Sequence, residues 1–328
     1  MKTVSLCVVA LNEERYLPKL LNDFVNQDYP HNCIDIVLID SNSNDDTKKI
    51  MNLFSTENKD FRSVRVFDNP KRIQSSGWNV AISNFNTDLL IRIDAHSRIP
   101  ADFVTNNVSN ILSGEYVSGG VRKCIIEKEN LWSRMLLASE NSLFGSSFNK
   151  SRRSTKKQYV KTFFHACYAK EVIEKTGFFN EHLLRTEDNE YHFRIRQNGF
   201  RFSYDPKIES FQYARPSLLK MIKQKFQNGY WIGKTVWICP KCLSLFYFAP
   251  LLFVFFLIFL SFLSFLTPYP LLILIGIYFL FCLFNTIVSS IIERFSICNI
   301  LMPIVFFLMH VSYGAGTIIG LFSIKNHR

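Results

Sequence analysis

Two long uncharged stretches near the C-terminal end most restrict how this chain can fold. Residues 243–267 and residues 271–292 contain no charged side chain. A membrane-spanning helix needs about 20 consecutive apolar residues, and each stretch is long enough to cross a bilayer. Only Pro268, Tyr269 and Pro270 lie between the two stretches. This short link predicts a helical hairpin in a membrane.

A third apolar segment, residues 300–322, is less regular because it contains a proline, a histidine and three glycines. It could cross the membrane, or it could be a broken segment that packs on the other two. A third crossing would place Lys325 and Arg328 outside, mildly against the tendency of positive residues to stay in the cytoplasm. The sequence leaves both alternatives open.

Nearly all of the charge lies before these apolar segments. The formal net charge of the 328 residues is +11, and about +9 of it precedes residue 243. A basic surface next to membrane helices suits anionic headgroups and phosphorylated ligands. Nucleic acid is the competing partner, but no recognised nucleic-acid-binding motif accompanies the charge. We therefore expect a membrane and a phosphorylated ligand, and no nucleic acid.

The N-terminal third alternates between short strand patterns and single helices. The strand patterns cover residues 4–11, 34–39, 64–67 and 89–93, and a helical pattern follows each of them. This alternation favours an α/β fold with a parallel, Rossmann-type sheet. Functional side chains are then expected beyond the C-terminal ends of the strands. The acidic and polar groups of this part of the chain fall at those positions.

The fourth strand pattern ends in Asp94, Ala95 and His96. A carboxylate and an imidazole two residues apart can jointly hold a divalent cation such as Mn²⁺ or Mg²⁺. Such a cation would neutralise a diphosphate. The simpler alternative is that Asp94 caps the next helix, and the triplet alone does not decide between the two.

Three later segments also carry functional signals. Residues 149–161 are rich in Lys, Arg and Ser, and they form either a solvated loop or a flap that orders over an anionic substrate. Glu187 and Asp188 stand in the first turn of a predicted helix, where the helix dipole favours carboxylates. Residues 216–237 have the lysines and aromatic residues of an amphipathic helix in the bilayer interface.

In this order and spacing, several motifs resemble the family 2 glycosyltransferases of the GT-A fold. They are most similar to membrane-associated bacterial enzymes that build exopolysaccharide repeat units, succinoglycan-type transferases among them. The resemblance covers nearly the whole chain. The motifs are Val8-Val9-Ala10-Leu11-Asn12-Glu13-Glu14, Val37-Leu38-Ile39-Asp40-Ser41-Asn42-Ser43, Asn69-Pro70 with Gly77-Trp78-Asn79, Asp94-Ala95-His96, Glu187-Asp188 and His310-Val311-Ser312-Tyr313-Gly314-Ala315-Gly316.

The resemblance implies a nucleotide-sugar donor, with a UDP-sugar favoured. In such enzymes the acid that ends the second strand contacts the base or ribose, and Asp40 holds that position here. The loop from Ala10 to Glu13 would frame the same pocket, with Glu13 as its expected polar contact to the nucleotide and Ser43 beside it. Asp40 could instead be a helix cap.

The resemblance also implies roles for the metal and the base. The family's Asp-x-Asp triplet binds the diphosphate through Mn²⁺ or Mg²⁺, which maps onto Asp94 and His96, although His96 departs from the commonest pattern. The acidic pair near the acceptor supplies the general base, which maps onto Asp188 with Glu187 beside it. A positioned carboxylate must take the proton of the attacking acceptor hydroxyl, and the resemblance implies inversion at the anomeric carbon. Both acids could also be plain first-turn residues.

We expect a GT-A domain over residues 1–215, an interfacial helix region over 216–242 and a transmembrane region of two to three helices over 243–328. Residues 224–231 keep the glutamines and tryptophan of a motif found in processive synthases but lack its arginine. This favours a metal-dependent hexosyltransferase that adds one sugar to a polyprenyl-diphosphate-linked glycan during exopolysaccharide, capsule or O-antigen assembly.

The alternatives are a polyprenyl-phosphate sugar synthase, a processive polysaccharide synthase and a non-catalytic membrane partner. We expect the enzyme in the inner (cytoplasmic) membrane, with its catalytic domain in the cytoplasm and other polysaccharide-assembly proteins as further partners.

Overall fold

The computed structural model describes residues 1–145, 154–215, 217–292 and 296–323. The chain divides into two compact units. The first contains Met1–Lys123 and Lys150–Gln212, and the second contains Cys124–Asn149 and Tyr213–Arg328. A segment from the middle of the sequence thus joins the C-terminal helices. The expected three-part division of the chain stays a prediction.

Parallel strands form the first half of the sheet in the first unit. The strands β1 (Val4–Ala10), β2 (Ile34–Asp40), β3 (Ser63–Asp68) and β4 (Leu89–Asp94) lie in the order β3-β2-β1-β4. All three pairings are parallel, as the alternating pattern predicts. In their register Ala10 lies opposite Asp40, and Val9 lies opposite Asp94. The predicted functional positions therefore meet at one edge of the sheet.

Antiparallel strands extend this sheet beyond β4. The strand β8 (Ala166–Ala169) pairs antiparallel with β4, and the order continues through β6 (Val117–Ile125), β9 (Phe202–Tyr213) and β5 (Ser97–Arg98). The short β7 (Gln158–Val160) pairs antiparallel with β9. The result is a mixed sheet of the kind expected for the GT-A class.

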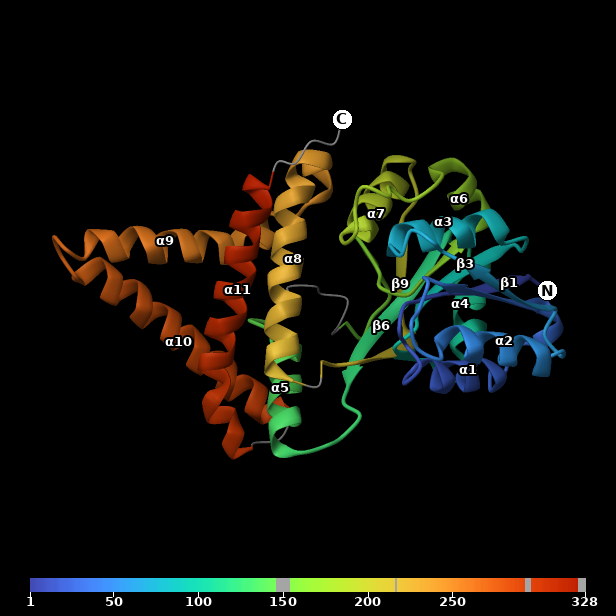
Figure 1. Ribbon diagram of the computed structural model, residues 1–328, viewed down its shortest axis with the longest axis horizontal. Coiled ribbons are helices and arrows are strands. Elements are labelled where there is room, and N and C mark those ends of the chain that lie inside the picture. Colours follow the sequence, from blue (N-terminus) through green and yellow to red (C-terminus); the bar gives the residue numbers. More distant parts are fainter. Residues whose placement is uncertain (146–153, 216, 293–295, 324–328) are drawn as a thin grey trace. The chain divides into compact units, whose positions relative to one another are not determined.

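Helices cover both faces of this sheet (Figure 1). One hydrophobic cluster joins the strands to α1 (Leu17–Val25), α2 (Thr47–Glu57) and α4 (Phe103–Leu112). The other joins them to α3 (Gln74–Asn84), α6 (Lys170–Thr176) and α7 (Glu187–Gln197). Alternate residues of β1 supply both clusters, with Leu6 and Val8 in the first and Cys7 in the second, because successive strand side chains point to opposite faces.

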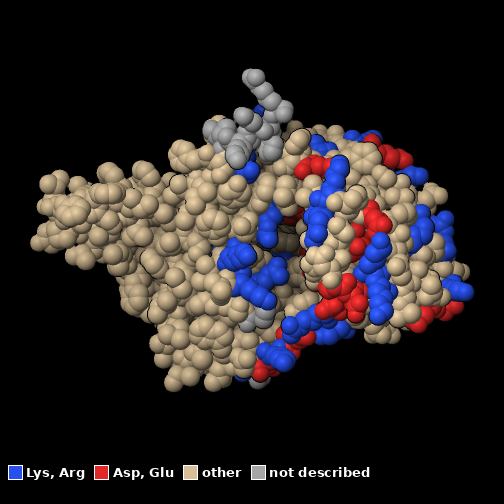
Figure 2. Space-filling view, viewed as in Figure 1, with Lys and Arg blue, Asp and Glu red and all other residues tan. Residues whose placement is uncertain are grey.

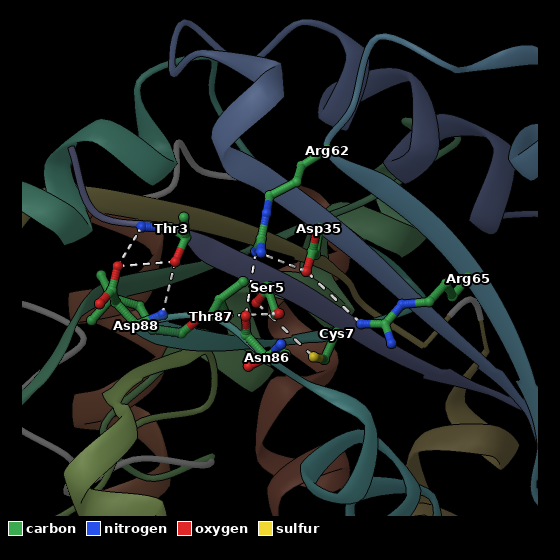
Figure 3. Close-up of polar contacts among 10 residues, drawn as sticks. Thr3, Ser5, Cys7, Asp35, Arg62, Arg65, Asn86, Thr87 and Asp88 are labelled. Atoms are coloured by element: carbon green, nitrogen blue, oxygen red, sulfur yellow. Dashed lines mark hydrogen bonds and ion pairs between the residues drawn. The ribbon is translucent and has the colours of Figure 1, made fainter.

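Polar contacts hold the starting ends of the strands, away from the predicted functional edge (Figure 3). The Oδ2 atom of Asp88 accepts hydrogen bonds from the backbone N–H (2.7 Å) and the hydroxyl (2.9 Å) of Thr3. The buried carboxylate of Asp35 pairs with Arg62 (3.3 Å) and Arg65 (3.8 Å). We call these contacts the strand-start cluster; they tie together the beginnings of β1, β2, β3 and β4.

The described part of the second unit consists of helices. These are α5 (Leu131–Asn141), α8 (Leu218–Ile238), α9 (Ala249–Leu263), α10 (Tyr269–Ile292) and α11 (Met302–Phe322), with short 3₁₀ turns between them. The helices α9 and α10 form the predicted hairpin, which carries no charged residue on the face shown in Figure 2. Leu245–Leu263, Tyr269–Ile292 and Ile297–Phe322 are long and apolar enough to cross a membrane.

The third apolar segment is one unbroken α-helix over Met302–Phe322. Its proline, Pro303, lies in the first turn, where no intrahelical donor is lost. The expected break is therefore wrong for the described residues, whereas the helix does pack on α9 and α10, as that alternative describes.

Candidate active site

Hydrogen bonds join the loops that follow β1 and β2. The backbone N–H of Asn12 donates to Ser43 Oγ (3.0 Å), and that of Asn44 donates to Asn12 Oδ1 (2.8 Å). Asn12 and Asn42 both adopt left-handed backbone conformations, with φ of 57° and 58°, a region that asparagine tolerates better than most residues. The two loops thus form one continuous rim at the functional edge.

Asp40 lies beneath this rim. Its side chain is 2% exposed, and both carboxyl oxygens accept from the backbone N–H of Ser43 (3.3 and 3.2 Å). The carbonyl of Ala10 accepts from the N–H of Ser41 (2.8 Å). Asp40 therefore stabilises its own turn. It does not cap α2, whose N-cap is Asp46, so the helix-cap alternative is wrong. Its contact with a nucleotide stays a prediction.

Asp94, His96 and Glu13 meet in one polar cluster with Gln212. The Nδ1 atom of His96 lies 3.1 Å from Glu13 Oε1. The side-chain amide nitrogen of Gln212 lies 2.9 Å from His96 Nε2 and 3.3 Å from Asp94 Oδ2. Because an ionised carboxylate only accepts hydrogen bonds, Nδ1 of His96 donates to Glu13. Its Nε2 lone pair then faces the Gln212 amide.

This arrangement fits a divalent cation. Two acceptors, Asp94 Oδ2 and His96 Nε2, both face the side-chain amide N–H group of Gln212, which carries a partial positive charge. A cation could bind between the same two acceptors. Carboxylate oxygen and imidazole nitrogen are ligands that Mn²⁺ accepts, and metal-bound histidines commonly donate their other N–H to a carboxylate, as His96 does to Glu13. Among the described residues no three His, Cys, Asp or Glu side chains could hold a metal together. A cation held by Asp94 and His96 would therefore keep coordination positions open for oxygen ligands of the substrate or water.

His165 completes this cluster. It directly precedes β8 and belongs to no recognisable sequence motif. Its Nε2 atom lies 3.7 Å from Asp94 Oδ2 and 3.1 Å from Ser97 Oγ. Burial would raise the pKa of Asp94, but the hydrogen bond and charge of His165, together with His96 and Arg92, hold it well below its usual value. Burial lowers the pKa of His165 itself. Asp94 is therefore ionised throughout the physiological range.

Glu187 and Asp188, which we call the acidic pair, begin α7. Burial raises the pKa of Glu187, and the charge of Asp188 raises it further, while Arg92 opposes the shift. Burial also raises the pKa of Asp188, again against Arg92. The preceding Thr186 has φ of 66°, an uncommon conformation for a β-branched residue. Carboxyl groups with raised pKa values suit general acid–base chemistry near neutral pH.

A buried arginine connects the two groups of acids. Arg92 is 4% exposed, and its guanidinium lies over the rings of Trp78 (5.3 Å) and Phe179 (5.9 Å). Its positive charge acts on Asp94 and on the acidic pair. Its Nε and Nη1 atoms have no hydrogen-bond partner among the described residues. Asp94 and Asp188 are thus linked electrostatically through one side chain of β4.

The basic loop predicted over residues 149–161 lies only partly within the described structure, because residues 149–153 fall outside it. In the described part, Lys157 pairs with Asp205 (2.7 Å), and Gln158–Val160 forms β7 against β9. This end of the segment is therefore attached to the sheet. Its action as a flap over substrate stays a prediction.

A mixed α/β sheet with acids gathered at the ends of its parallel strands, followed by long apolar helices, defines a glycosyltransferase of the GT-A class. Residues 5–177 match the family model described as "Glycosyl transferase family 2". This match covers more than half of the chain, and the chain therefore belongs to glycosyl transferase family 2. The family expected from the sequence motifs is confirmed.

Two curated relatives are similar over much of their length. One is the dolichyl N-acetyl-alpha-D-glucosaminyl phosphate 3-beta-D-2,3-diacetamido-2,3-dideoxy-beta-D-glucuronosyltransferase of Methanococcus voltae, with 27% identity over 326 residues and 96% of each chain covered. The other is the succinoglycan biosynthesis protein ExoA of Rhizobium meliloti, with 28% identity over 234 residues, 69% of this chain and 68% of that protein. The expected likeness to succinoglycan-type proteins is confirmed.

Solved structures show the same fold. The mannosyltransferase PcManGT of Pyrobaculum calidifontis, in complex with GDP-Man and Mn²⁺, has a TM-score of 0.60 at 15% identity, covering 99% of this chain and 88% of that one. S. aureus TarS 1-349, in complex with UDP-GlcNAc, has a TM-score of 0.51 at 16% identity, covering 70% and 66%. At these identities the likeness establishes the GT-A fold alone, and that prediction is confirmed.

Proposed function

We propose that this enzyme transfers one sugar from a nucleotide-sugar donor to a lipid-linked glycan, with inversion at the anomeric carbon. One observation carries the proposal: the ionised Asp94 and the acidic pair, which has raised pKa values, lie within the electrostatic reach of the same buried Arg92. Binding of the diphosphate through a cation needs a carboxylate that is always ionised, whereas proton removal needs a carboxylate that can gain and release a proton near neutral pH.

The donor would bind at the rim formed by the loops after β1 and β2. Asp40, Ala10 and Ser43 would contact the nucleoside, and a UDP-sugar is the favoured donor. Asp94 and His96 would face the diphosphate, and Glu13 would hold the His96 ring in place. The nucleotide sugars bound by PcManGT and TarS support a donor of this class.

Mn²⁺ or Mg²⁺ held by Asp94 and His96 would supply positive charge to stabilise the departing diphosphate. The remaining chemistry falls to the chain itself. Asp188 takes the proton of the acceptor hydroxyl while the oxygen of that hydroxyl forms a bond to the anomeric carbon. The bond from that carbon to the diphosphate breaks on the opposite side, which inverts the centre. Glu187 retains a proton beside Asp188, because two adjacent buried carboxylates resist carrying two charges.

The acceptor is proposed to be a polyprenyl-diphosphate-linked glycan in exopolysaccharide, capsule or O-antigen assembly. The dolichyl-linked substrate in the name of the Methanococcus relative and the succinoglycan role in the name of ExoA support a lipid-linked glycan. The apolar helices would anchor the enzyme in the inner membrane, with the catalytic unit in the cytoplasm. Other polysaccharide-assembly proteins would act beside it.

The test uses membranes that contain the full-length chain and labelled nucleotide sugars, with and without Mn²⁺. Asp94→Asn, His96→Ala and Asp188→Asn should each lower transfer about 100-fold or more. Glu171→Gln is the matched control, because Glu171 is an exposed first-turn acid of α6. Undiminished transfer by Asp188→Asn would overturn the assignment of the base. A product carrying the sugar on a lone lipid phosphate would instead identify a polyprenyl-phosphate sugar synthase.

A further inference from the structure

The apolar character of α11 has two possible origins. A helix that is hydrophobic on all sides either crosses a membrane or lies in the core of a protein. Protein buries 39% of the most apolar 18-residue stretch of Ile297–Phe322. The corresponding shares are 6% for Leu245–Leu263 and 11% for Tyr269–Ile292. The third segment therefore differs from the other two in its surroundings.

The helices α8 and α11 lie side by side within the second unit (Figure 1). Glycines of each helix face the backbone of the other. A Cβ atom added to Gly316 or Gly320 would lie 2.2 or 2.0 Å from a backbone carbonyl oxygen of α8. A Cβ atom added to Gly229 or Gly233 would lie 2.0 or 2.5 Å from a carbonyl oxygen of α11. These distances are too short for any side chain, and the two helices are in direct backbone contact.

This contact extends to the ends of both helices. The indole N–H of Trp237, near the end of α8, donates to the carbonyl oxygen of Leu321, near the end of α11 (3.0 Å). The helices run in the same direction, since Gly229 faces Tyr313 and Gly233 faces Thr317. The C-terminal half of α11 must therefore lie at the same depth in a membrane as α8.

The helix α8 is too charged to lie in hydrocarbon. It carries Lys220, Lys223, Lys225 and Lys234, and each lysine at the bilayer centre costs about 3 kcal/mol. Lys225 is buried and paired with Glu140, but Lys223 is exposed and Lys234 is partly exposed. These two lysines are eleven positions apart, so about 17 Å of helix separates them, far less than the roughly 30 Å of hydrocarbon in a bilayer. The glycine contacts with α11 fall within and around this interval.

The other half of α11 also has a polar helix beside it. His310 Nε2 lies 2.8 Å from the carbonyl oxygen of Phe144, just after α5. The helices α5 and α8 are joined by an ion pair between Glu140 and Lys225 (3.2 Å). The side chains of Val305, Phe306 and Met309 belong to a core cluster that includes α5 residues. Protein therefore packs against one face of α11 along its length, while Ile304, Phe307 and Ile319 on another face stay exposed.

The α9–α10 hairpin has the opposite character. Its two helices are exposed almost throughout, and in Figure 1 the hairpin projects away from the α8–α11 pair. Phe265 and Leu266 at its tip are 88% and 85% exposed. The base of the hairpin reaches α11, where an added Cβ on Gly314 would lie 2.4 Å from the carbonyl oxygen of Pro250. Only this hairpin offers an all-round apolar surface to lipid tails among the described helices.

We propose that the α9–α10 hairpin is the one element that crosses the bilayer, and that α11 does not cross. The α8–α11 pair instead lies in the membrane interface, with the accessible Lys220, Lys223 and Lys234 of α8 facing anionic headgroups. Lys325 and Arg328 then follow α11 on the same side as the other basic residues, which removes the conflict with the positive-inside rule. This proposal is independent of the chemistry proposed for the first unit.

The test maps three positions in the full-length chain in membrane vesicles of known orientation. Epitope tags are placed before Met1, after Arg328 and, in a separate chain, between Leu266 and Thr267; a second chain with the tag after Pro268 guards against a misfolded insertion. Binding of an impermeant antibody is compared between right-side-out and inside-out vesicles. A soluble marker sealed inside the vesicles controls for leakage.

The tags at both termini should react on the same face, and the hairpin tag should react on the other. A C-terminal tag that reacts on the face opposite to the N-terminal tag would show a third crossing and overturn the proposal. A hairpin tag that reacts on the same face as both termini would overturn the crossing assigned to α9 and α10. Loss of sugar transfer in a tagged chain would not alter either conclusion, because the readout is antibody binding.

Discussion

The Nδ1 atom of His96 lies 3.1 Å from the Oε1 atom of Glu13, which connects the loop after β4 to the loop after β1. Glu13 was predicted to contact the nucleotide, whereas the structure gives its carboxylate a hydrogen bond to a candidate metal ligand. Its nucleotide contact stays a prediction, and its bond to His96 has a consequence that can be measured.

Replacing Glu13 by alanine should weaken Mn²⁺ binding about 10- to 100-fold, because the His96 ring loses the acceptor that fixes its orientation and tautomer. Glu13→Gln should retain most of the affinity, since the amide oxygen can still accept from Nδ1. Titration of transfer activity with Mn²⁺ measures both variants. Equal Mn²⁺ dependence in Glu13→Ala and the unaltered enzyme would contradict the orienting role.

Replacing Arg92 by methionine should move the pH profile of sugar transfer to higher pH. Arg92 lowers the pKa values of Glu187 and Asp188, and without its charge the base ionises only at higher pH. At a pH below the pKa of the base, each unit by which this pKa rises reduces the ionised fraction of the base about tenfold. Activity at neutral pH should therefore fall and recover in part as the pH rises.

Arg92→Lys is the matched control for this prediction, because it keeps a positive charge at the same place in β4. Its profile should stay near that of the unaltered enzyme. A methionine variant that loses activity equally at every pH would show that Arg92 acts through packing against Trp78 and Phe179, and not through its charge.

Glu187→Gln should stabilise the folded protein at alkaline pH. The pKa of Glu187 is raised in the folded state above its unfolded value of about 4.3. The folded state therefore binds the Glu187 proton more tightly than the unfolded state does. The stabilisation from this proton is complete below the unfolded pKa and is lost as the pH rises through the folded pKa. The glutamine variant has no such loss.

The melting temperature in detergent, followed between about pH 5 and about pH 9, measures this difference. The gap between Glu187→Gln and the unaltered enzyme should widen as the pH rises. Asp94 acts in the opposite sense, because its pKa is lowered on folding and its stabilisation is lost only in acid below this range. A gap that stays constant with pH would mean that Glu187 is ionised in the folded protein.

Gly320→Leu should destabilise the second unit by separating α8 from α11. An added Cβ would lie 2.0 Å from a backbone carbonyl oxygen, and overpacking of this kind costs about 1–3 kcal/mol or more. Gly276→Leu in α10 is the matched control, since an added Cβ there has no heavy atom within 4 Å. Thermal unfolding of both variants in detergent gives the comparison, and similar losses in the two would contradict direct helix contact.

The parallel strands could be predicted from local patterns because strands buried on both faces are apolar along their whole length. β1 and β2 are of this kind, and their predicted bounds agree with the structure to within one residue. The strand β9 shows no such run, since Asp205, Pro206 and Lys207 interrupt it. Its pairing depends on neighbouring strands, which a local pattern does not contain.

The candidate site shows the same division. Asp94, His96 and the acidic pair could be proposed from motifs, whereas His165 and Gln212 have no distinctive neighbours in the sequence. His165, just before β8, and Gln212, in β9, become part of the site only because these strands join the same sheet as β4. Arg92 precedes Asp94 by two residues in β4, but the sequence does not show that the acidic pair of α7 lies within reach of its charge. The third apolar segment could be recognised by composition, but its contact with α8 depends on glycines whose partners lie about 90 residues away.

The strand-start cluster holds the sheet together at the end of the strands that lies away from the candidate active site. Thr3, Asp35 and Asp88 secure the alignment of the sheet at one end, and the loops at the other end are free to change without disturbing it. Under the proposed function, exchange of the loop after β2, and of the loop after β1 apart from Glu13, should change donor preference while the contacts at the beginnings of the strands keep the sheet aligned.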